Sequence, residues 1–423
     1  MAISQREFAE QVVRQLTNAG FTAFWAGGCV RDLLVGREPR DYDVATSARP
    51  GQVREVFGKR RTFSVGESFG VIVVLGPKSA GQVDVATFRS DGNYIDGRRP
   101  ESVVFSSPEE DAQRRDFTIN GMFYDPIKKE VMDFVGGEQD LVAGVVRAIG
   151  DPHARMKEDK LRMLRAVRFA ATFDFELDVA TAEAVQSMSD QIAVVSAERV
   201  AQELRRMLVD RHRGRAVELC NDAGLLLRII PELKAVVCDR ECWTQLHKGL
   251  ASLVEPDFAL VFGLLLDSVI GATEQAGTID SRLSEVVGRR LKLANQEIDD
   301  AAWLLRHRRA FDNAADLPLS RLKRILANSL APDLIALVRA RTLAKGEAAR
   351  DVDFCEHYLK TTGRDVLEPS PLISGDDLIK AGFRPGPKFK DVLDRVRDAQ
   401  LNLQISNAAE ALELAAQFMP DND

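Results

Sequence analysis

Cysteine and histidine are scarce in this sequence, and long apolar runs are missing from it. The chain has 423 residues but only five cysteines and five histidines. The one close cysteine pair, Cys238 and Cys242, has no second pair or histidine at zinc-site spacing, so neither a zinc site nor a disulfide framework is expected. No stretch approaches the roughly 20 apolar residues of a membrane-spanning helix. We therefore expect a globular protein that does not cross a membrane.

A large excess of either charge is also absent. The net charge is −7, with 45% hydrophobic and 29% charged residues, which is typical of a soluble protein with several domains at this length. The N-terminus lacks a secretory signal pattern and is expected to be a helix with Ser4 and Glu7 in a capping box, which favours a cytoplasmic protein. Basic clusters at 205–215, 306–309 and 321–324 are candidates for RNA contact, although solvated helix faces commonly have this composition.

The pattern of the sequence changes near Lys157. Before it, short apolar runs alternate with turns, and their length and β-branched content predict strands within 21–28, 41–46, 70–76, 82–88 and 131–137. After it, helical periodicity continues almost to the C-terminus. The expected fold class is α+β, with a mixed sheet and helices first and all-α domains after it.

The stretch that begins at Gly27 combines features of a nucleotide and metal site. Asp41 and Asp43 are one residue apart, so on a strand their side chains point the same way and repel each other. Bound Mg²⁺ ions would remove this repulsion and activate a hydroxyl group for attack on a nucleotide. The turn at Gly27 and Gly28 opens an expected helix, whose first N–H groups suit phosphates. An isolated D-x-D pair after Pro39 is more often part of a turn.

The complete string, Gly-Gly, x-x-Arg-Asp, a spacer and D-x-D, resembles motif A of the tRNA nucleotidyltransferase and poly(A) polymerase family, a branch of the polymerase-β nucleotidyltransferases. The resemblance implies a polymerase-β-like catalytic head in which Asp41 and Asp43 are catalytic and bind the metal. It places Gly28 and Arg31 beside the nucleotide. Asp84, in "VDVATFRSD", is a candidate third carboxylate that either supports this site or is only solvated at a strand end.

The string "RRDFTINGMFYDP", which begins at Arg114, resembles motif B of the same family. Asn120 lies among apolar residues and requires a hydrogen-bonding partner if it is buried. The resemblance implies that the Arg-Arg-Asp of this motif, Arg114, Arg115 and Asp116, and the following Asn120 line the sugar and phosphates of the nucleotide, a task that suits guanidinium groups. Ordinary charges on a solvated surface are the alternative for the two arginines and the aspartate.

The string "EDKLR" resembles motif D, which selects the base. Asp159 and Arg162 are three residues apart, and on one helix they would share a face. Cytosine and adenine both present an amino donor beside a ring-nitrogen acceptor, which a carboxylate and a guanidinium match, whereas guanine and uracil present the reverse order. We expect these two residues to act as a protein template for C and A, the alternative being a surface ion pair. Arg165 and Arg168 complete the candidate nucleotide-binding set.

The remaining motifs are expected to support the template. The segment 140–150 resembles the flexible motif C, and "SAERVAQELRRML" resembles motif E, in which Glu198, Arg199 and Glu203 would hold the base-reading residues in place. The helix of the latter segment is expected to start with Ser196 as its N-cap. The expected domains are a nucleotidyltransferase head (1–140), a base-recognition neck (141–210), a helical body (211–365) and a tRNA-binding tail (366–423).

The resemblance implies a template-independent enzyme that adds CCA to the 3′ end of tRNA from CTP and ATP, with Mg²⁺ as cofactor. A poly(A) polymerase and a partial, A-adding tRNA nucleotidyltransferase share these motifs and remain alternatives. The polar segment 90–113 is expected to be the loop between motifs A and B, whose presence disfavours an enzyme that adds only CC. The sequence leaves the oligomeric state undetermined.

Overall fold

The computed structural model describes residues 3–64, 70–91, 103–274 and 282–418. The chain forms two compact units, Met1–Pro231 and Glu232–Asp423. The finer division into head, neck, body and tail stays a prediction.

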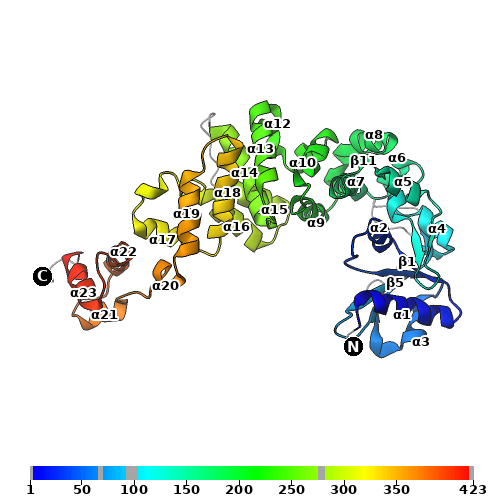
Figure 1. Cartoon of the computed structure of the whole chain (residues 1–423), viewed down its shortest axis with the longest axis horizontal. Coiled ribbons are helices and arrows are strands. Elements are labelled where there is room, and N and C mark those ends of the chain that lie inside the picture. The colour runs from blue at the N-terminus through cyan, green and yellow to red at the C-terminus, as the bar shows by residue number, and fades with distance from the viewer. Residues whose placement is uncertain (1–2, 65–69, 92–102, 275–281, 419–423) are drawn as a thin grey trace. The chain divides into compact units, whose positions relative to one another are not determined.

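A seven-stranded mixed sheet organises the first unit (Figure 1), with the strand order β3-β4-β5-β2-β1-β8-β9. The strands are β1 (Ala23–Ala26), β2 (Asp43–Thr46), β3 (Thr62–Ser64), β4 (Val71–Leu75), β5 (Gln82–Thr87), β8 (Phe123–Asp125) and β9 (Glu130–Met132). β2 and β5 are parallel, and the other neighbours in this sheet are antiparallel. Each of the five predicted segments contains or overlaps a strand, although the strand in the last one ends at Met132.

One face of the sheet is covered by α1 (Gln5–Asn18) and α3 (Pro50–Phe57), which lie on the same side of it in Figure 1. The apolar residues of α1 recur at helical spacing, and Phe8, Val12 and Leu16 are fully buried against the sheet. The predicted capping box of Ser4 and Glu7 starts this helix. Because side chains alternate along a strand, residues next to the buried ones in β2 and β5 point to the opposite face.

Helices surround the sheet and continue beyond it. In the first unit they are α2 (Gly28–Leu34), α4 (Pro108–Gln113), α5 (Gly137–Ala143), α6 (Pro152–Glu158), α7 (Leu161–Phe173), α8 (Val179–Met188), α9 (Ala197–Leu208), α10 (Arg213–Asp222) and α11 (Leu226–Ile229). The predicted all-α neck (141–210) is not wholly helical, because β10 (Val145–Val146) and β11 (Glu176–Leu177) form a short parallel pair. Ser196 is the N-cap residue of α9, as predicted, although its side chain makes no capping hydrogen bond.

The predicted loop at 90–113 contains regular secondary structure. Its ends belong to the antiparallel pair β6 (Arg89–Asp91) and β7 (Val103–Phe105), and its last residues form α4. Residues 92–102 lie outside the described residues. The pairing of β6 with β7 brings the two ends of this connection together, which periodicity alone did not indicate.

The described part of the second unit is helical. Its helices are α12 (Lys234–Cys238), α13 (Arg240–Ser252), α14 (Phe258–Glu274), α15 (Leu283–Arg290), α16 (Asn295–His307), α17 (Leu319–Leu326), α18 (Ala331–Ala344), α19 (Arg350–Thr361), α20 (Arg364–Leu367), α21 (Gly375–Lys380), α22 (Lys388–Leu401) and α23 (Ala408–Phe418). The last three helices enclose a small core of their own around Leu378, Val396 and Ala411. Within the described ranges, no helix has both the length and the apolar character needed to cross a bilayer.

Candidate active site

The parallel pairing of β2 with β5 brings acidic side chains together at the sheet. Asp43 is in register with Asp84, and Asp41 lies two residues before the start of β2. Partial removal from water and the neighbouring Asp84 and Asp41 carboxylates raise the pKa of Asp43 to about 6, against the opposing effect of Arg115. The pKa of Asp84 is also raised, by partial burial and by Asp41. The three predicted acidic residues thus repel one another at one point of the fold.

Such a cluster of hard oxygen donors fits a divalent cation such as Mg²⁺, because a cation cancels the repulsion between the carboxylates. Among the residues that the structure describes, no group of three or more His, Cys, Asp or Glu side chains is arranged so that it could hold a metal ion by itself. An open arrangement of this kind suits Mg²⁺, which usually binds one or two carboxylates together with water and substrate phosphates.

The turn before α2 is built around Arg115. Gly27 has a positive φ of 73°, and a Cβ atom at this position would lie 2.8 Å from Nη1 of Arg115. The positive φ favours glycine at this position, and the missing Cβ leaves room for the guanidinium group. Arg115 also brings a positive charge close enough to lower the pKa of Asp43. Arg115 is the second arginine of the predicted motif B, next to Arg114.

Asp111 holds both arginines of motif B. Its Oδ1 accepts from Nε and Nη2 of Arg114 at 2.9 and 2.8 Å, and its Oδ2 accepts from Nε and Nη2 of Arg115 at 3.2 and 2.9 Å. The Asp111 side chain is only 2% exposed. Sequence reasoning missed this residue, although an acid placed three and four residues before two arginines on a helix is a recognisable pattern.

A buried polar network joins motif A, motif B and α7. Nη1 of Arg31 donates to Oδ1 of Asn120 at 2.6 Å, and Nδ2 of Asn120 donates to Oδ1 of Asp116 at 3.0 Å. The other oxygen of Asp116 accepts two bonds from Arg165, at 2.8 and 2.6 Å. Burial acts to raise the pKa of Asp116, but Arg165 and Asn120 outweigh it and hold this pKa below its ordinary value. The side-chain oxygen and nitrogen of buried Asn120 thus both have the hydrogen-bonding partners that the sequence led us to expect.

The helix predicted to carry Asp159 and Arg162 is interrupted between them, so the expectation that they share a face of one helix is wrong. α6 ends at Glu158, Asp159 has an extended backbone with φ −144°, and α7 begins at Leu161. Oδ1 of Asp159 accepts from the backbone N–H of Leu161, the first residue of α7, at 3.1 Å, while Lys160 is the N-cap residue of this helix. Asp159 therefore stands at the start of α7, and Arg162 follows in its first turn.

Arg199 of α9 fixes the Asp159 carboxylate. Nη1 and Nη2 of Arg199 donate to Oδ1 and Oδ2 at 3.0 and 2.6 Å. A carboxylate has about four acceptor positions, and Arg199 and Leu161 use three of them. One acceptor position, on Oδ2, is left without a partner within the described residues.

Arg162 is fixed in a corresponding way. Its Nη1 donates to the carbonyl of Arg155 at 3.0 Å and to Oε2 of Glu158 at 2.5 Å, and its Nη2 donates to the carbonyl of Arg114 at 3.2 Å. A guanidinium group has five N–H donors, so Nε–H and one Nη2–H remain without a partner among the described residues. Asp159 therefore leaves one hydrogen-bond acceptor position unused, and Arg162 leaves two N–H donors unused.

The rest of the predicted set lies around these residues. Arg168 forms a buried ion pair with Glu203 of α9, which is also 3.8 Å from Arg165. Glu198 is exposed in the first turn of α9, whereas the adjacent Arg199 makes the contact to Asp159. Of the three motif E residues expected to hold the base-reading residues, Arg199 therefore contacts Asp159 directly, and Glu203 pairs with Arg168.

The head and the carboxylate cluster define a nucleotidyltransferase. The model of the poly A polymerase head domain matches residues 23–147, and a model described as a probable RNA and SrmB-binding site of polymerase A matches residues 174–236.

Sequence similarity along nearly the whole chain identifies the family. The chain is 32% identical to the CCA-adding enzyme of Geobacillus thermodenitrificans, over 95% of this chain and 94% of that protein. It is 30% identical to the CCA-adding enzyme of Lactobacillus helveticus, over 96% and 95%. The solved structure of the Bacillus stearothermophilus CCA-adding enzyme in complex with CTP matches with a TM-score of 0.75 and 27% identity, covering 98% of this chain and 97% of that one. The chain belongs to the family of CCA-adding tRNA nucleotidyltransferases and poly(A) polymerases.

Proposed function

We propose that this protein completes the 3′ end of tRNA by adding C, C and A from CTP and ATP. The observation that carries the proposal is the arrangement of Asp159 and Arg162, each fixed by neighbours and each retaining hydrogen-bonding capacity. Similarity to CCA-adding enzymes along nearly the whole chain supports the same conclusion.

The unused groups match the bases that the reaction requires. The remaining acceptor of Asp159 suits the amino group of cytosine or adenine, and the remaining donors of Arg162 suit the adjacent ring nitrogen. Guanine or uracil would place donor against donor and acceptor against acceptor. Since each buried polar group without a partner costs about 1–3 kcal/mol, the site rejects these two bases.

Asp41 and Asp43 are the residues that would hold Mg²⁺, with Asp84 beside them in register. Bound Mg²⁺ would activate the terminal 3′-hydroxyl of the RNA and neutralise charge on the triphosphate. The 3′-oxygen forms a bond to the α-phosphorus of the nucleotide, and pyrophosphate leaves. Arg114 and Arg115, which Asp111 orients, supply positive charge for the phosphates and the sugar. Positioning and charge stabilisation account for most of the catalysis.

The decisive experiment uses a tRNA that lacks its last three nucleotides. The purified protein is incubated with this RNA, Mg²⁺ and the four nucleotides, singly and together, and the products are sequenced. Addition of C, C and A followed by arrest supports the proposal. Addition of a single A only after CC is supplied would indicate an A-adding enzyme, and unlimited A addition would indicate a poly(A) polymerase. The cytoplasmic location predicted from the sequence is part of the same proposal.

A further inference from the structure

The aromatic ring at the C-terminal end of α7 is contacted by two arginines of the motif A segment. The guanidinium carbon of Arg31 lies 4.4 Å from the centroid of the Phe173 ring, and that of Arg37 lies 4.6 Å from it. Both distances are within the limit of about 6 Å at which a guanidinium group attracts an aromatic ring. Arg31 is buried in α2, whereas Arg37 lies in the connection from α2 to β2. One ring of α7 therefore contacts motif A at two points.

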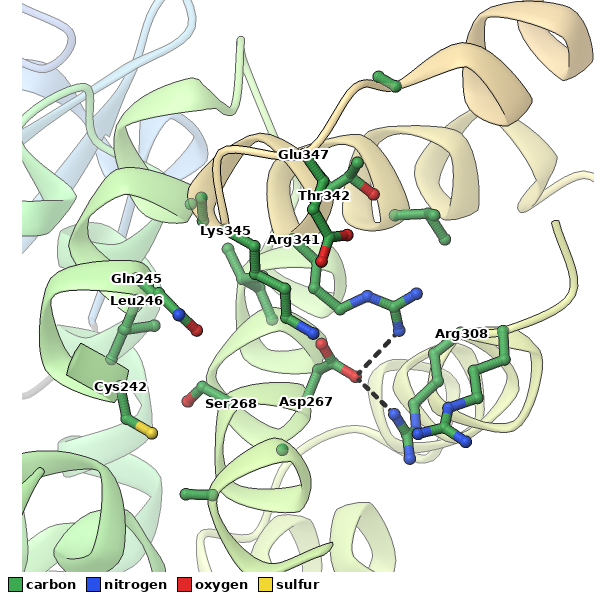
Figure 2. Close-up of a pocket in the computed structure, with 18 of the residues that line it drawn as sticks. Cys242, Gln245, Leu246, Asp267, Ser268, Arg308, Arg341, Thr342, Lys345 and Glu347 are labelled. Carbon is green, nitrogen blue, oxygen red and sulfur yellow. Dashed lines mark ion pairs between the residues drawn. The ribbon is translucent and has the colours of Figure 1, made fainter. Parts of the chain in front are cut away.

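Arg37 has partners of an unusual kind. In the second unit, for comparison, Figure 2 marks ion pairs of Arg308 and Arg341 with the carboxylate of Asp267. Arg37 forms no ion pair with any residue that the structure describes. Its Nη1 and Nη2 instead donate to the backbone carbonyl of Thr172, at 3.5 and 3.4 Å. The side chain of Arg37 thus binds the end of α7 rather than a neighbouring acid.

The contact is made where α7 has carbonyl groups to satisfy. A helix leaves its last four carbonyls without partners inside the helix and carries partial negative charge at this end. The backbone N–H of Asp174 donates to the carbonyls of Ala170 and Ala171. The carbonyl of Thr172 is the one that Arg37 reaches. The positive charge of Arg37 therefore matches both the ring and the carbonyl end of this helix.

The backbone on either side of Arg37 is fixed as well. The N–H of Arg37 donates to the carbonyl of Asp32 at 2.9 Å. Four positions later the same connection reaches Asp41, and the next residue, Tyr42, is 2% exposed and donates from its hydroxyl to Glu38 at 3.3 Å. A displacement of Arg37 would therefore be passed to Asp41 through a short segment that is attached at both ends.

Phe173 and the proposed base-reading residues lie at opposite ends of α7. Arg162 is in the first turn of this helix, and Phe173 is its last residue. A helix of 13 residues is about 20 Å long, and a shift at one end displaces the other. The contacts at Phe173 therefore affect the distance between the base-reading end and the segment that carries Asp41.

We propose that Phe173 is a positioning residue that holds, through Arg37, the segment of Asp41 at a fixed distance from the base-reading end of α7. Without this contact the nucleotide still binds through its base and its phosphates, but its α-phosphorus is no longer aligned with the attacking hydroxyl group. The effect on the reaction rests on the proposed nucleotide addition, whereas the effect on the segment does not.

Phe173→Leu tests the ring, because it keeps an apolar side chain. Phe169, one turn earlier, lies 5.0 Å from the guanidinium carbon of Arg31, so the substitution chiefly releases Arg37. Addition of C to a tRNA that lacks its last three nucleotides is followed in single turnovers. The maximal rate should fall about fivefold, while the CTP concentration at half-maximal rate changes less than about twofold. Phe173→Tyr keeps the ring and should restore the rate.

Phe175→Leu is the matched control. The Phe175 ring lies 5.7 Å from that of Phe173, but within the described residues no guanidinium group faces it. This variant loses an equal amount of aromatic surface from the same cluster, and its rate should equal that of the wild type. A fall in rate caused only by weaker packing would appear in both leucine variants.

A double variant tests whether Arg37 and Phe173 act together. Arg37→Ala alone should lower the maximal rate about threefold. Combined with Phe173→Leu it should have little further effect, giving a loss of about fivefold instead of the roughly fifteenfold loss of two independent changes.

Hydrogen exchange of the full-length protein without substrates gives a readout that does not depend on activity. Phe173→Leu should speed exchange in the segment 36–42 at least about threefold, and Phe175→Leu should leave it unchanged. If the wild-type protein adds no nucleotide, the proposed function fails, and this exchange alone decides whether Phe173 fixes the segment.

Three results would overturn the proposal. They are an unchanged maximal rate in Phe173→Leu when the wild type is active, independent losses in the double variant, and unchanged exchange in the segment 36–42. If Arg37→Ala instead raises the tRNA concentration needed for half-maximal rate and leaves the maximal rate unchanged, Arg37 is an RNA contact and the positioning role is wrong.

Discussion

Arg199 donates one hydrogen bond to each carboxylate oxygen of Asp159, at 3.0 and 2.6 Å, from a helix 40 residues further along the chain. This pair fixes the plane of the carboxylate and determines which of its acceptor positions remains available. The accuracy of base selection therefore depends on α9 as well as on the residues proposed to contact the base.

Replacing Arg199 by Ala should impair base selection more than it impairs folding. Loss of two charge-assisted hydrogen bonds, each worth about 1.5–3 kcal/mol, leaves Asp159 free to rotate. We expect kcat/KM for CTP and ATP to fall about 10- to 100-fold and incorporation of UTP and GTP to rise relative to them. Arg206→Ala, on the exposed end of the same helix, is the control. Unchanged selectivity in Arg199→Ala would contradict the proposed role.

Asp41→Asn should abolish nucleotide addition while tRNA binding remains. The substitution keeps the size of the side chain but removes a negative charge from the predicted Mg²⁺ site. We expect a loss of activity of at least about 10³-fold, since the metal supplies most of the charge stabilisation. Titration with Mg²⁺ and then Mn²⁺ in the wild-type protein tests metal dependence separately. Full activity in the presence of a chelator would remove the metal from the mechanism.

Asp111→Asn should affect both stability and nucleotide affinity. The buried carboxylate accepts bonds from two arginines, so its loss leaves two guanidinium groups without their anchor. Removing one partner of a buried ion pair costs about 3–5 kcal/mol, and we expect a lower free energy of unfolding together with a higher KM for CTP and ATP. Glu110→Gln, exposed on the same helix, should change neither. A stability loss with KM unchanged would limit Asp111 to a structural role.

Asp333 should make the second unit less stable as the pH rises. The pKa of Asp333 is raised from 3.8 to about 6. Partial burial is the main cause, and the nearby carboxylates of Asp257 and Asp300 add to it. The folded state then binds the proton more tightly than the unfolded state, so stability is lost as the pH increases from about 4 to 6.

Asp333→Asn should abolish this pH dependence and stabilise α18 at pH 7. The gain should be no more than about 1 kcal/mol, because water reaches part of the carboxyl and screens it. Hydrogen exchange of α18 at pH 5 and 7, corrected for intrinsic rates, measures the difference. Asp299→Asn, exposed on α16, is the matched variant. A wild-type α18 that is equally protected at both pH values would contradict the assignment.

Only some of the arginines in the basic cluster 306–309 should contribute to RNA binding. Arg306 and Arg309 are exposed, whereas Arg308 is 11% exposed and lies near Asp267. Arg306→Ala should reduce the slope of log K against log salt by about 1 if this residue contacts a phosphate. Arg308→Ala should leave the slope unchanged. Equal slopes for Arg306→Ala and the wild type would identify this exposed face as merely solvated.

The strands of the head were predictable because their signals are local. The segments 70–76 and 82–88 are rich in β-branched residues and bounded by glycine, polar residues or charges, and both form strands. Their pairing was not predictable in the same way. The contact between Asp43 and Asp84 arises from parallel strands about 40 positions apart, and no local pattern specifies such a register.

Residues of the candidate site were predictable where a sequence motif includes them. They were not predictable where packing in the folded chain determines their role. Asp111 was missed because a buried acid among charged neighbours looks like part of a solvated helix face until its burial is known. The break after Glu158 was missed because apolar periodicity continues across it without proline or glycine. An aspartate two residues before the next helix was its one local sign.

The register of β2 and β5 has a consequence for the folding of the head. A shift of β5 by one residue would turn Asp84 into the apolar layer that now holds Val85 and would bring Val85 to the acidic face. An incorrectly assembled head would thus bury a charge and lose its third carboxylate at the same time. Residual activity in a poorly folded preparation should therefore measure the fraction of molecules with the native strand alignment, each working at the full rate.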